Sequence, residues 1–328
     1  MKKNIYKFFY KPKKSKNYLV AAAIGAEAMN DFKKYSLNLW KKYCKINDIG
    51  ILVFQDYIVK KSDSEWKSAT WQKHLFGKYI IDNIKDIENI CLLDLDILVN
   101  PHAPNIFDYL EKNKISVISH LKNLPYSNSE NLIRRKIAFN RHHYYTKRYP
   151  LDSSMTMSNK QVFNYHGFKD PGDYFCFGVF MYNLKNHAEF IYSTYYNYKP
   201  KVKSLTAGNE PFINHEVLTK RKVKWLDYKF QAYWIFEMVE KYPFLYEFKN
   251  KKNVLIKKCI EASLQENYFL HFTGSWYDGD HWKMKGIFQS AKTNNIFKKF
   301  LKFKKYKLKN KAHKNRIMPK GKSVIKKI

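Results

Sequence analysis

The chain has 328 residues, of which 45% are hydrophobic and 17% aromatic, and these fractions exclude a disordered polymer. Eleven glycines and ten prolines exclude collagen-like and proline-rich proteins, and no run reaches the roughly 20 apolar residues of a membrane-spanning helix. The formal net charge of +33 indicates an attraction for phosphate, whether in nucleic acid, anionic lipid or nucleotide.

The chain begins with a basic segment, residues 1–16, which we expect to be a flexible lead-in. Apolar runs at 18–24 and 49–54 then flank a helical pattern over 26–43, which predicts a strand-helix-strand unit with parallel strands. A secretory signal peptide is the alternative for the first run, because basic residues precede it and small residues follow it. The run is short for that purpose, and the unit around it favours a strand.

The same pattern continues in the next segments. The sequence predicts a helix over 64–84, a strand over 89–95, a short helix over 101–111 and a strand over 115–119. Residues 17–120 are therefore expected to form a Rossmann-like, nucleotide-binding half of a doubly wound α/β sheet.

Residues 121–297 are expected to complete a single α/β domain, residues 17–297, with a mixed sheet and helices on both faces. Residues 127–172 are polar and aromatic and predict a loop with irregular helix that covers a site. The remaining patterns predict strands at 174–182, 223–226 and 268–272 and helices at 187–198, 210–218 and 287–301.

The chain ends in a lysine-rich tail over 298–328, with no acidic residue after Asp280. We expect this tail to dock on an anionic membrane surface. The four cysteines are scattered without a C-x-x-C pair, which favours reduced thiols in a cytoplasmic protein, peripheral at most on a membrane's inner face.

Two carboxylates stand out in an apolar context. Asp94 and Asp96 follow the apolar run 90–93 and precede another apolar run, 97–99. Residues i and i+2 of an extended strand point the same way, so both carboxylates reach one point, where they suit Mg²⁺ or Mn²⁺ with a diphosphate. The similar pair Asp278 and Asp280 lies in a polar loop, as chance alone predicts.

Six segments resemble, in order, motifs of the GT-A fold nucleotide-sugar glycosyltransferases, in particular family 8 and related enzymes with a D-x-D motif. The segments are Trp71–Lys73, Leu92–Val99, Phe175–Asn183, Gly208–Asn214, Trp225–Asp227 and His271–Gly274, the last with the H-x-x-G pattern. The likeness covers the chain from about Tyr18 to about Trp282.

This resemblance implies a GT-A fold and transfer of a hexose from a nucleoside-diphosphate sugar to a hydroxyl of a glycan, lipid-linked or protein acceptor. It implies that Asp94, Asp96 and His271 hold Mn²⁺ or Mg²⁺, and that Asp94 also contacts the ribose of the donor. A metal ion there would neutralise charge on the departing diphosphate.

Further roles follow from the same resemblance. Lys73, Gly274 and a downstream lysine, Lys283 or Lys285, would contact the donor phosphates. The chain departs from family 8 here, because Ser275-Trp276 stands where that family continues with Lys-Pro-Trp.

The acid-base chemistry of the site stays open between two outcomes. Glu210 or Asp227 is the general base if the reaction inverts the anomeric centre. The resemblance implies retention, in which case Glu210 holds sugar hydroxyls, or simply begins a helix with a favourable charge.

Two other classes are alternatives. A haloacid-dehalogenase-like phosphohydrolase would use Asp94 as nucleophile, but it needs a downstream acidic pair and Gly-Thr where this chain has Ile97-Leu98. A basic nucleic-acid-binding protein would explain the charge, but no helix-turn-helix, zinc-finger or RNA-recognition pattern is present, so a nucleic-acid partner is not expected.

Overall fold

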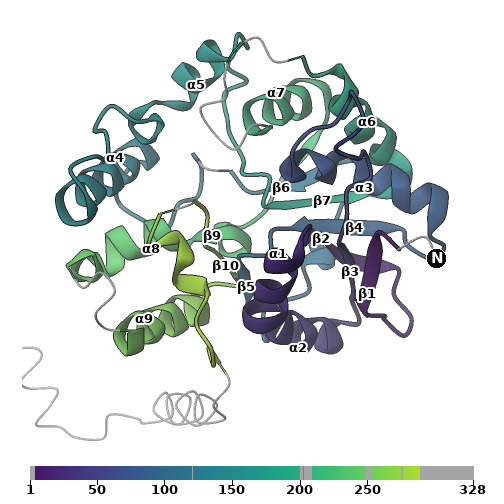
Figure 1. Ribbon diagram of the computed structural model, residues 1–328, viewed down its shortest axis with the longest axis horizontal. Coiled ribbons are helices and arrows are strands. Elements are labelled where there is room, and N and C mark those ends of the chain that lie inside the picture. Colours follow the sequence, from purple (N-terminus) through teal and green to yellow (C-terminus); the bar gives the residue numbers. More distant parts are fainter. Residues whose placement is uncertain are drawn as a thin grey trace, which may run out of the picture. The chain divides into compact units, whose positions relative to one another are not determined.

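A seven-stranded mixed sheet lies at the centre of the fold (Figure 1). The computed structural model describes residues 4–119, 121–199, 202, 209–247, 253–274 and 276–288. In pairing order, the strands are β1 (Tyr6–Tyr10), β3 (Gly50–Phe54), β2 (Asn17–Ala22), β4 (Asn89–Leu93), β7 (Val179–Asn183), β6 (Ile115–Val117) and β8 (Val223–Trp225).

The strand directions bring two distant segments to one edge of the sheet. All strands except β1 and β7 run the same way, and β7 lies antiparallel to β4 with Val179 opposite Leu93. The end of β4 and the start of β7 therefore meet where open α/β sheets bind ligands. The predicted mixed, doubly wound α/β sheet is confirmed.

Helices cover both faces of the sheet, because each strand alternates its apolar side chains between them. Leu19 and Cys91 pack on one face, and Val20 and Leu92 pack on the other. The first face is covered by α1 (Ala26–Asp31), the π-helical turn η1 (Phe32–Ser36) and α2 (Leu37–Asn47). The second is covered by α3 (Ala69–Asn83), α6 (Leu184–Asn197) and α7 (Glu210–Lys220) (Figure 1).

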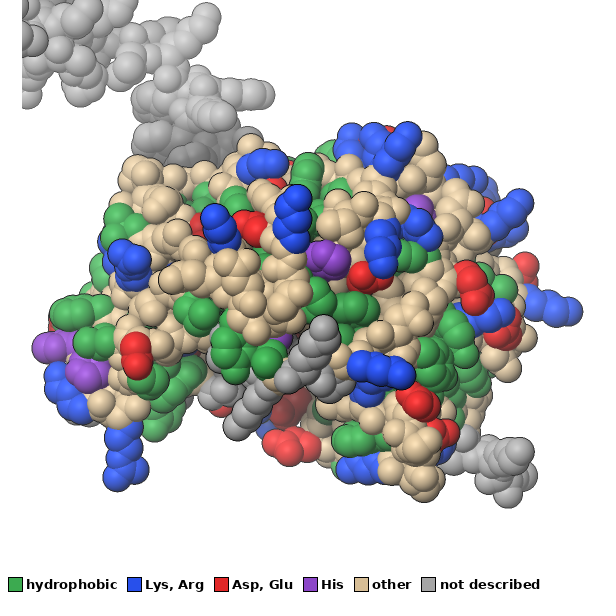
Figure 2. Space-filling model, turned by 90° about the horizontal axis from the view of Figure 1, so that it is seen from above, with side chains coloured by type: hydrophobic (Ala, Val, Ile, Leu, Met, Phe, Trp, Pro, Cys, Tyr) green, Lys and Arg blue, Asp and Glu red, His purple; other side chains and the backbone are tan. Residues whose placement is uncertain are grey.

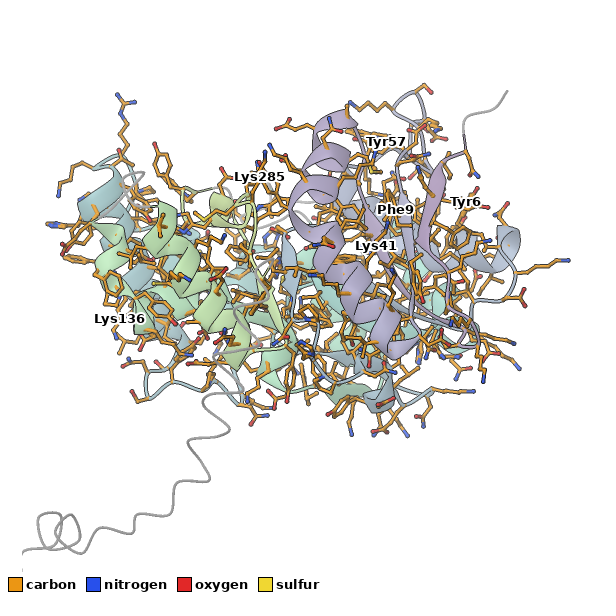
Figure 3. All side chains as sticks on the ribbon, turned by 90° about the horizontal axis from the view of Figure 1, so that it is seen from below. Tyr6, Phe9, Lys41, Tyr57, Lys136 and Lys285 are labelled. Carbon is orange, nitrogen blue, oxygen red and sulfur yellow. The ribbon has the colours of Figure 1, made fainter. Side chains whose placement is uncertain are left out.

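The N-terminal segment corrects one expectation. Residues 1–16 are predicted to be a flexible lead-in, but Tyr6–Tyr10 forms an edge strand antiparallel to β3. Its aromatic side chains alternate between the two faces: Tyr6 packs on the α3 side, whereas Phe9 contacts Phe32 of η1 (Figure 3). The basic residues between them hid this alternation in the sequence.

The first apolar run is a central strand. As β2, it lies between β3 and β4, with Leu19, Val20 and Ala21 fully buried. A signal peptide is therefore the wrong interpretation of this run. The predicted helix over 64–84 is α3, which begins later, at Ala69.

A second, three-stranded sheet lies beside the first. It is formed by β5 (Ile97–Val99), β10 (Phe269–His271) and β9 (Ala232–Tyr233), with β10 antiparallel to β5 and parallel to β9. Helices α8 (Trp234–Lys241) and α9 (Asn253–Glu266) follow β9. Sequence patterns missed β9 and both helices; β9 has two residues and α8 only eight, too few for a period to stand out.

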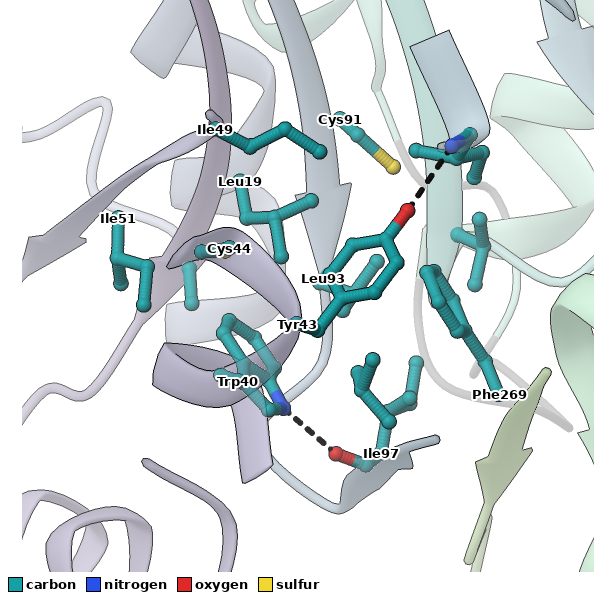
Figure 4. Packing of buried hydrophobic residues seen from close by; sticks show 14 of the residues in the cluster. Leu19, Trp40, Tyr43, Cys44, Ile49, Ile51, Cys91, Leu93, Ile97 and Phe269 are labelled. Carbon is teal, nitrogen blue, oxygen red and sulfur yellow. Dashed lines mark hydrogen bonds between the residues drawn. The ribbon is translucent and has the colours of Figure 1, made fainter. Parts of the chain in front are cut away.

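Helix α2 and the turn before it fix the segment between β4 and β5. Trp40 Nε1 donates a 2.8 Å hydrogen bond to the Ile97 carbonyl oxygen (Figure 4), and Ser36 Oγ donates a 2.7 Å bond to that of Leu95. Tyr43 accepts a bond from the Ile106 N–H on the same side. These hydrogen bonds fix the backbone around Asp94 and Asp96 from the side of α2.

The predicted loop over 127–172 carries more helix than expected. It contains α4 (Glu130–Asn140), the π-helical η3 (Arg141–Tyr145), a short 3₁₀ turn η4 (Ser154–Thr156) and α5 (Asn159–Tyr165). The strand expected over 174–182 begins only at Val179. The lysine-rich tail, and the predicted helix over 287–301 beyond its first two residues, lie outside the described residues.

One face of the molecule shows how its charged side chains are distributed. On the face in Figure 2, lysines and arginines are scattered between acidic, apolar and uncharged groups. Among the described residues, no helix is long and apolar enough to cross a bilayer.

A buried ion pair ties η3 to the segment after β10. Arg141 Nη2 and Nε donate to the two carboxylate oxygens of Asp278 at 2.8 and 3.0 Å. Asp278 is fully buried, whereas Asp280 is exposed and pairs with Lys283. The second Asp-x-Asp pair is therefore divided between a structural residue and a surface residue.

We expect Asp278→Ala to lower the free energy of unfolding by about 3–5 kcal/mol, because it leaves a buried guanidinium without its counter-charge. Asp280→Ala is the matched control: its side chain is 66% exposed, so the change should stay below about 0.5 kcal/mol. Urea denaturation followed by circular dichroism measures both. Equal losses would contradict a structural role for Asp278.

Candidate metal and donor site

Three potential metal ligands meet beside the ends of β4 and β10. One ligand atom each of Asp94, Asp96 and His271 lies within 4.8 Å of the others. His271 Nε2 is 3.4 Å from Asp96 Oδ1 and 3.8 Å from Asp94 Oδ2. The structure therefore brings together the three residues that the motifs implied, and no other such group of three exists among the described residues.

Strand pairing explains why these residues converge. The Asp94 N–H donates a 3.0 Å bond to the Gly178 carbonyl oxygen before β7, continuing the β4–β7 ladder. In the second sheet, His271 pairs with Ile97, and the Phe272 N–H donates a 3.1 Å bond to the Asp96 carbonyl oxygen. Two sheets thus hold the backbone on both sides of the carboxylates.

The three side chains form a small acidic cluster with one buried member. His271 is 2% exposed, whereas the Asp94 and Asp96 side chains are 34% and 28% exposed. Burial acts to lower the pKa of His271, but the charges of Asp96 and then Asp94 outweigh it, so the pKa is raised. The carboxylates thus favour positive charge at this point.

The hydrogen bonding of Gln231 bears on whether a metal ion can bind to His271. It is fully buried at the end of η5 (Tyr228–Gln231); its Nε2 lies 3.2 Å from His271 Nδ1, and its Oε1 has no partner among the described residues. Turning the amide by 180° lets Oε1 accept the Nδ1 proton. Nε2 of His271 is then free to bind a metal ion. The carboxylate-imidazole set, with Nε2 of His271 facing Asp94 and Asp96, therefore fits Mg²⁺ or Mn²⁺.

Gly178 leaves the room that the cluster needs. A methyl group on its Cα would lie 2.8 Å from Gln231 Nε2 and 3.0 Å from Asp94 Oδ2, and closer still to the His271 ring. Only glycine lets the backbone before β7 approach these groups.

Lys73 reaches the site from α3 as the partner of Asp94. Its Nζ donates to Asp94 Oδ1 at 2.8 Å and to the Phe177 carbonyl oxygen at 2.9 Å, and its side chain is 7% exposed. Lys73 therefore orients Asp94, and the ammonium charge of Lys73 is already paired with this carboxylate.

Two open cavities share Gly274 in their lining. One, which we name the Gly25 cavity, is lined by Gly25, Asp96, Gly274 and Lys283 among others. Lys283 stands at its wall, 3.2 Å from a carboxylate oxygen of Asp31. The predicted donor contacts Gly274 and Lys283 thus meet Asp96 in one cavity.

The other, the Glu210 cavity, is lined by Cys176, Glu210 and Gly274 together with residues of α4, α5 and α8, and by none of the three cluster residues. Glu210 accepts hydrogen bonds from the Phe177 N–H at 3.2 Å and from Tyr174 Oη at 3.3 Å. Burial, reinforced by Glu210 and Asp94, raises the pKa of Cys176 well above its usual value, so its thiol stays protonated.

Two predicted motif residues lie elsewhere. Asp227 begins η5, where its side chain accepts from the Lys229 N–H, and it lines a separate cavity that shares no residue with the other two. Asn209 is 1% exposed and its amide donates to the Thr70 carbonyl oxygen and contacts His74 Nε2. Burial, with Lys73 and Lys67, lowers the pKa of His74 to about 3, so this ring is neutral.

Sequence reasoning missed Gln231 and the reason for Gly178. Gln231 falls between the predicted elements, and no spacing relates it to His271. Gly178 lies inside a motif that was recognised, where a glycine within an apolar strand segment signals a close approach of another group.

The sequence matches no protein-family profile and no curated protein. Among solved structures, the fold is similar to a glycosyltransferase involved in glycosylation of the major capsid of PBCV-1 (10% identity, 82% of this chain, 99% of that chain, TM-score 0.45).

It is also similar to the bifunctional glycosyltransferase WbbM in its apo form (11% identity, 87% of this chain, 52% of that chain, TM-score 0.41). A third structure is the galactosyltransferase LgtC in complex with donor and acceptor sugar analogues (13% identity, 78% of this chain, 87% of that chain, TM-score 0.41). All three are glycosyltransferases, the class that the sequence motifs resemble. The function must nevertheless come from the residues of the site.

We expect Gly178→Ala to weaken Mn²⁺ binding at least tenfold, because the new methyl group displaces His271 or Asp94. Isothermal titration with Mn²⁺ measures the affinity. Gly77→Ala is the matched control, because its methyl group would meet Tyr182 and Ala188, away from the cluster. It should lower stability and leave Mn²⁺ affinity unchanged. Full Mn²⁺ affinity in Gly178→Ala would contradict this geometry.

Proposed function

We propose that this protein is a metal-dependent glycosyltransferase that moves a hexose from a nucleoside-diphosphate sugar to a hydroxyl acceptor. One observation carries the proposal: Asp96 of the cluster of Asp94, Asp96 and His271 lines the Gly25 cavity, and Gly274 lines both this cavity and the Glu210 cavity. A donor with a diphosphate at its centre has this layout, with a nucleoside on one side and a sugar on the other.

The Gly25 cavity suits the nucleoside diphosphate. It lies beyond the end of β2, and both Lys283 and Asp96 line it. When bound, Mg²⁺ or Mn²⁺ would supply Lewis-acid stabilisation of the departing diphosphate. Lys283, paired with Asp31 and Asp280, lines the same cavity, and Lys73 keeps Asp94 oriented toward the cluster.

The Glu210 cavity suits the sugars. We propose that Glu210, oriented by Phe177 and Tyr174, accepts hydrogen bonds from sugar hydroxyls. Asn214 supports it, because its amide bonds both the N–H and the carbonyl of Phe175 and ties α7 to this segment. Retention at the anomeric centre is proposed on the resemblance, and in an inverting reaction Glu210 would be the base.

The alternative classes fit the site less well. A phosphohydrolase needs a free nucleophilic Asp94, whereas its Oδ1 is engaged by Lys73, and the third member of the cluster is an imidazole, not a carboxylate. A nucleic-acid-binding protein is expected to carry a basic stripe, and the face in Figure 2 shows none.

We expect Asp96→Asn to reduce nucleotide-sugar turnover at least tenfold in Mn²⁺ or Mg²⁺, because the site loses one anionic ligand. Donor hydrolysis, followed as release of the nucleoside diphosphate across a panel of nucleotide sugars, is the measurement. Chelation of the metal should abolish it.

Asp108→Asn, at an exposed position that lines none of the three cavities, should retain wild-type turnover. Asp96→Asn with more than a tenth of the wild-type rate, or turnover that survives chelation, would contradict the metal role.

The lysine-rich tail over 298–328 motivates a second proposal, that the protein docks on the anionic inner face of a membrane. Each basic residue near such a surface adds about 1 kcal/mol of attraction. We expect the full chain to float with vesicles containing 30% phosphatidylserine and a chain ending at 297 to stay in solution. Flotation that does not depend on anionic lipid would contradict docking.

A further inference from the structure

One wall of the Glu210 cavity is formed by residues that have no part in the proposed metal and donor site. Glu130 of α4 and Asn159 of α5 line it there, beside the aromatic side chains of Tyr174 and Phe236. In Figure 1, α4 and α5 lie on the far side of β9 and β10 from α1 and α2. The helices α1 and α2 belong to the half that carries the Gly25 cavity.

Two polar atoms in this wall are buried and unpartnered. Glu130 and Asn159 are only 5% and 8% exposed. Glu130 Oε1 accepts a 3.2 Å bond from Arg134, but Glu130 Oε2 and Asn159 Nδ2 have no hydrogen-bond partner in the described part of the chain. Buried groups of this kind are costly unless a ligand or water satisfies them. The wall thus offers one acceptor and one donor.

The charges around these atoms exclude an anionic ligand. Arg134 is engaged by Glu130 and by the Ser154 carbonyl oxygen, and Arg141 by Asp278. The carboxylate of Glu210 faces the same cavity. The ligand must therefore carry no negative charge and must both donate and accept hydrogen bonds, and the hydroxyl groups of a neutral molecule meet both conditions. The aromatic and aliphatic lining suits the apolar face of a sugar ring.

We propose that Glu130 Oε2 and Asn159 Nδ2 bind hydroxyl groups of a neutral saccharide acceptor, with Glu130 accepting and Asn159 donating. This inference rests on the proposed function, because it gives the α4–α5 end of the cavity to the acceptor and the Gly25 side to the nucleotide. It restricts the acceptor to a carbohydrate, free or at the end of a glycan.

Binding of saccharides to the full chain tests this assignment without donor turnover. The probes are methyl hexopyranosides, lactose, maltose and cellobiose, followed by saturation-transfer NMR. We expect at least one to bind, and Asn159→Leu to weaken that binding at least tenfold. Asn164→Leu, the same change at an exposed position of α5, is the matched control and should bind as the wild type does.

Stability separates loss of binding from loss of fold. Asn159→Leu removes an unpaired buried donor, so its melting temperature should not fall. Glu130→Gln should also weaken binding tenfold, but it leaves the Arg134 charge without its partner, so Asn159→Leu is the decisive variant. Absence of binding by every saccharide, or binding unaffected by Asn159→Leu, would overturn the proposal.

The two proposals fail separately. Saccharide binding that depends on Asn159, without any nucleotide-sugar turnover, would keep the carbohydrate site and reject the transferase. Metal-dependent donor hydrolysis with saccharide binding independent of Asn159 would keep the transferase and reject this acceptor site.

Discussion

Backbone pairing on both sides of Asp94 and Asp96 is the constraint on which the site depends. The bond from Asp94 to Gly178 fixes one carboxylate to the large sheet, and the bond from Phe272 to Asp96 fixes the other to the small sheet. His271 follows from the same pairing, since it precedes Phe272 on β10. Two carboxylates held this close repel each other, and a divalent cation relieves that repulsion. The geometry is thus preorganised for a metal ion.

Local sequence patterns predicted only the parts of this arrangement that are local. An apolar run followed by carboxylates at i and i+2 was enough to place Asp94 and Asp96 at a strand end. His271 came from the resemblance alone, because no spacing connects β5 with β10, and Gln231 was missed for the same reason. The strand β1 was missed because Lys7 interrupts its aromatic residues. The helix α8 was missed because eight residues are too few to show a clear period, and α9 was missed with it.

The overall charge and the local charge act in opposite directions. A net charge of +33 attracts an anionic donor to the protein, yet the point where its diphosphate would lie carries two carboxylates. On the proposed function, a bound cation would offset this repulsion before the diphosphate enters the site.

Pulsed electron paramagnetic resonance of the Mn²⁺-loaded protein tests the metal site most directly, because it detects nitrogen bound to the ion. The geometry predicts ¹⁴N coupling from one imidazole in the wild-type protein and its loss in His271→Gln. Mn²⁺ bound without ¹⁴N coupling, or coupling that persists in His271→Gln, would contradict the cluster of Asp94, Asp96 and His271 as the metal centre.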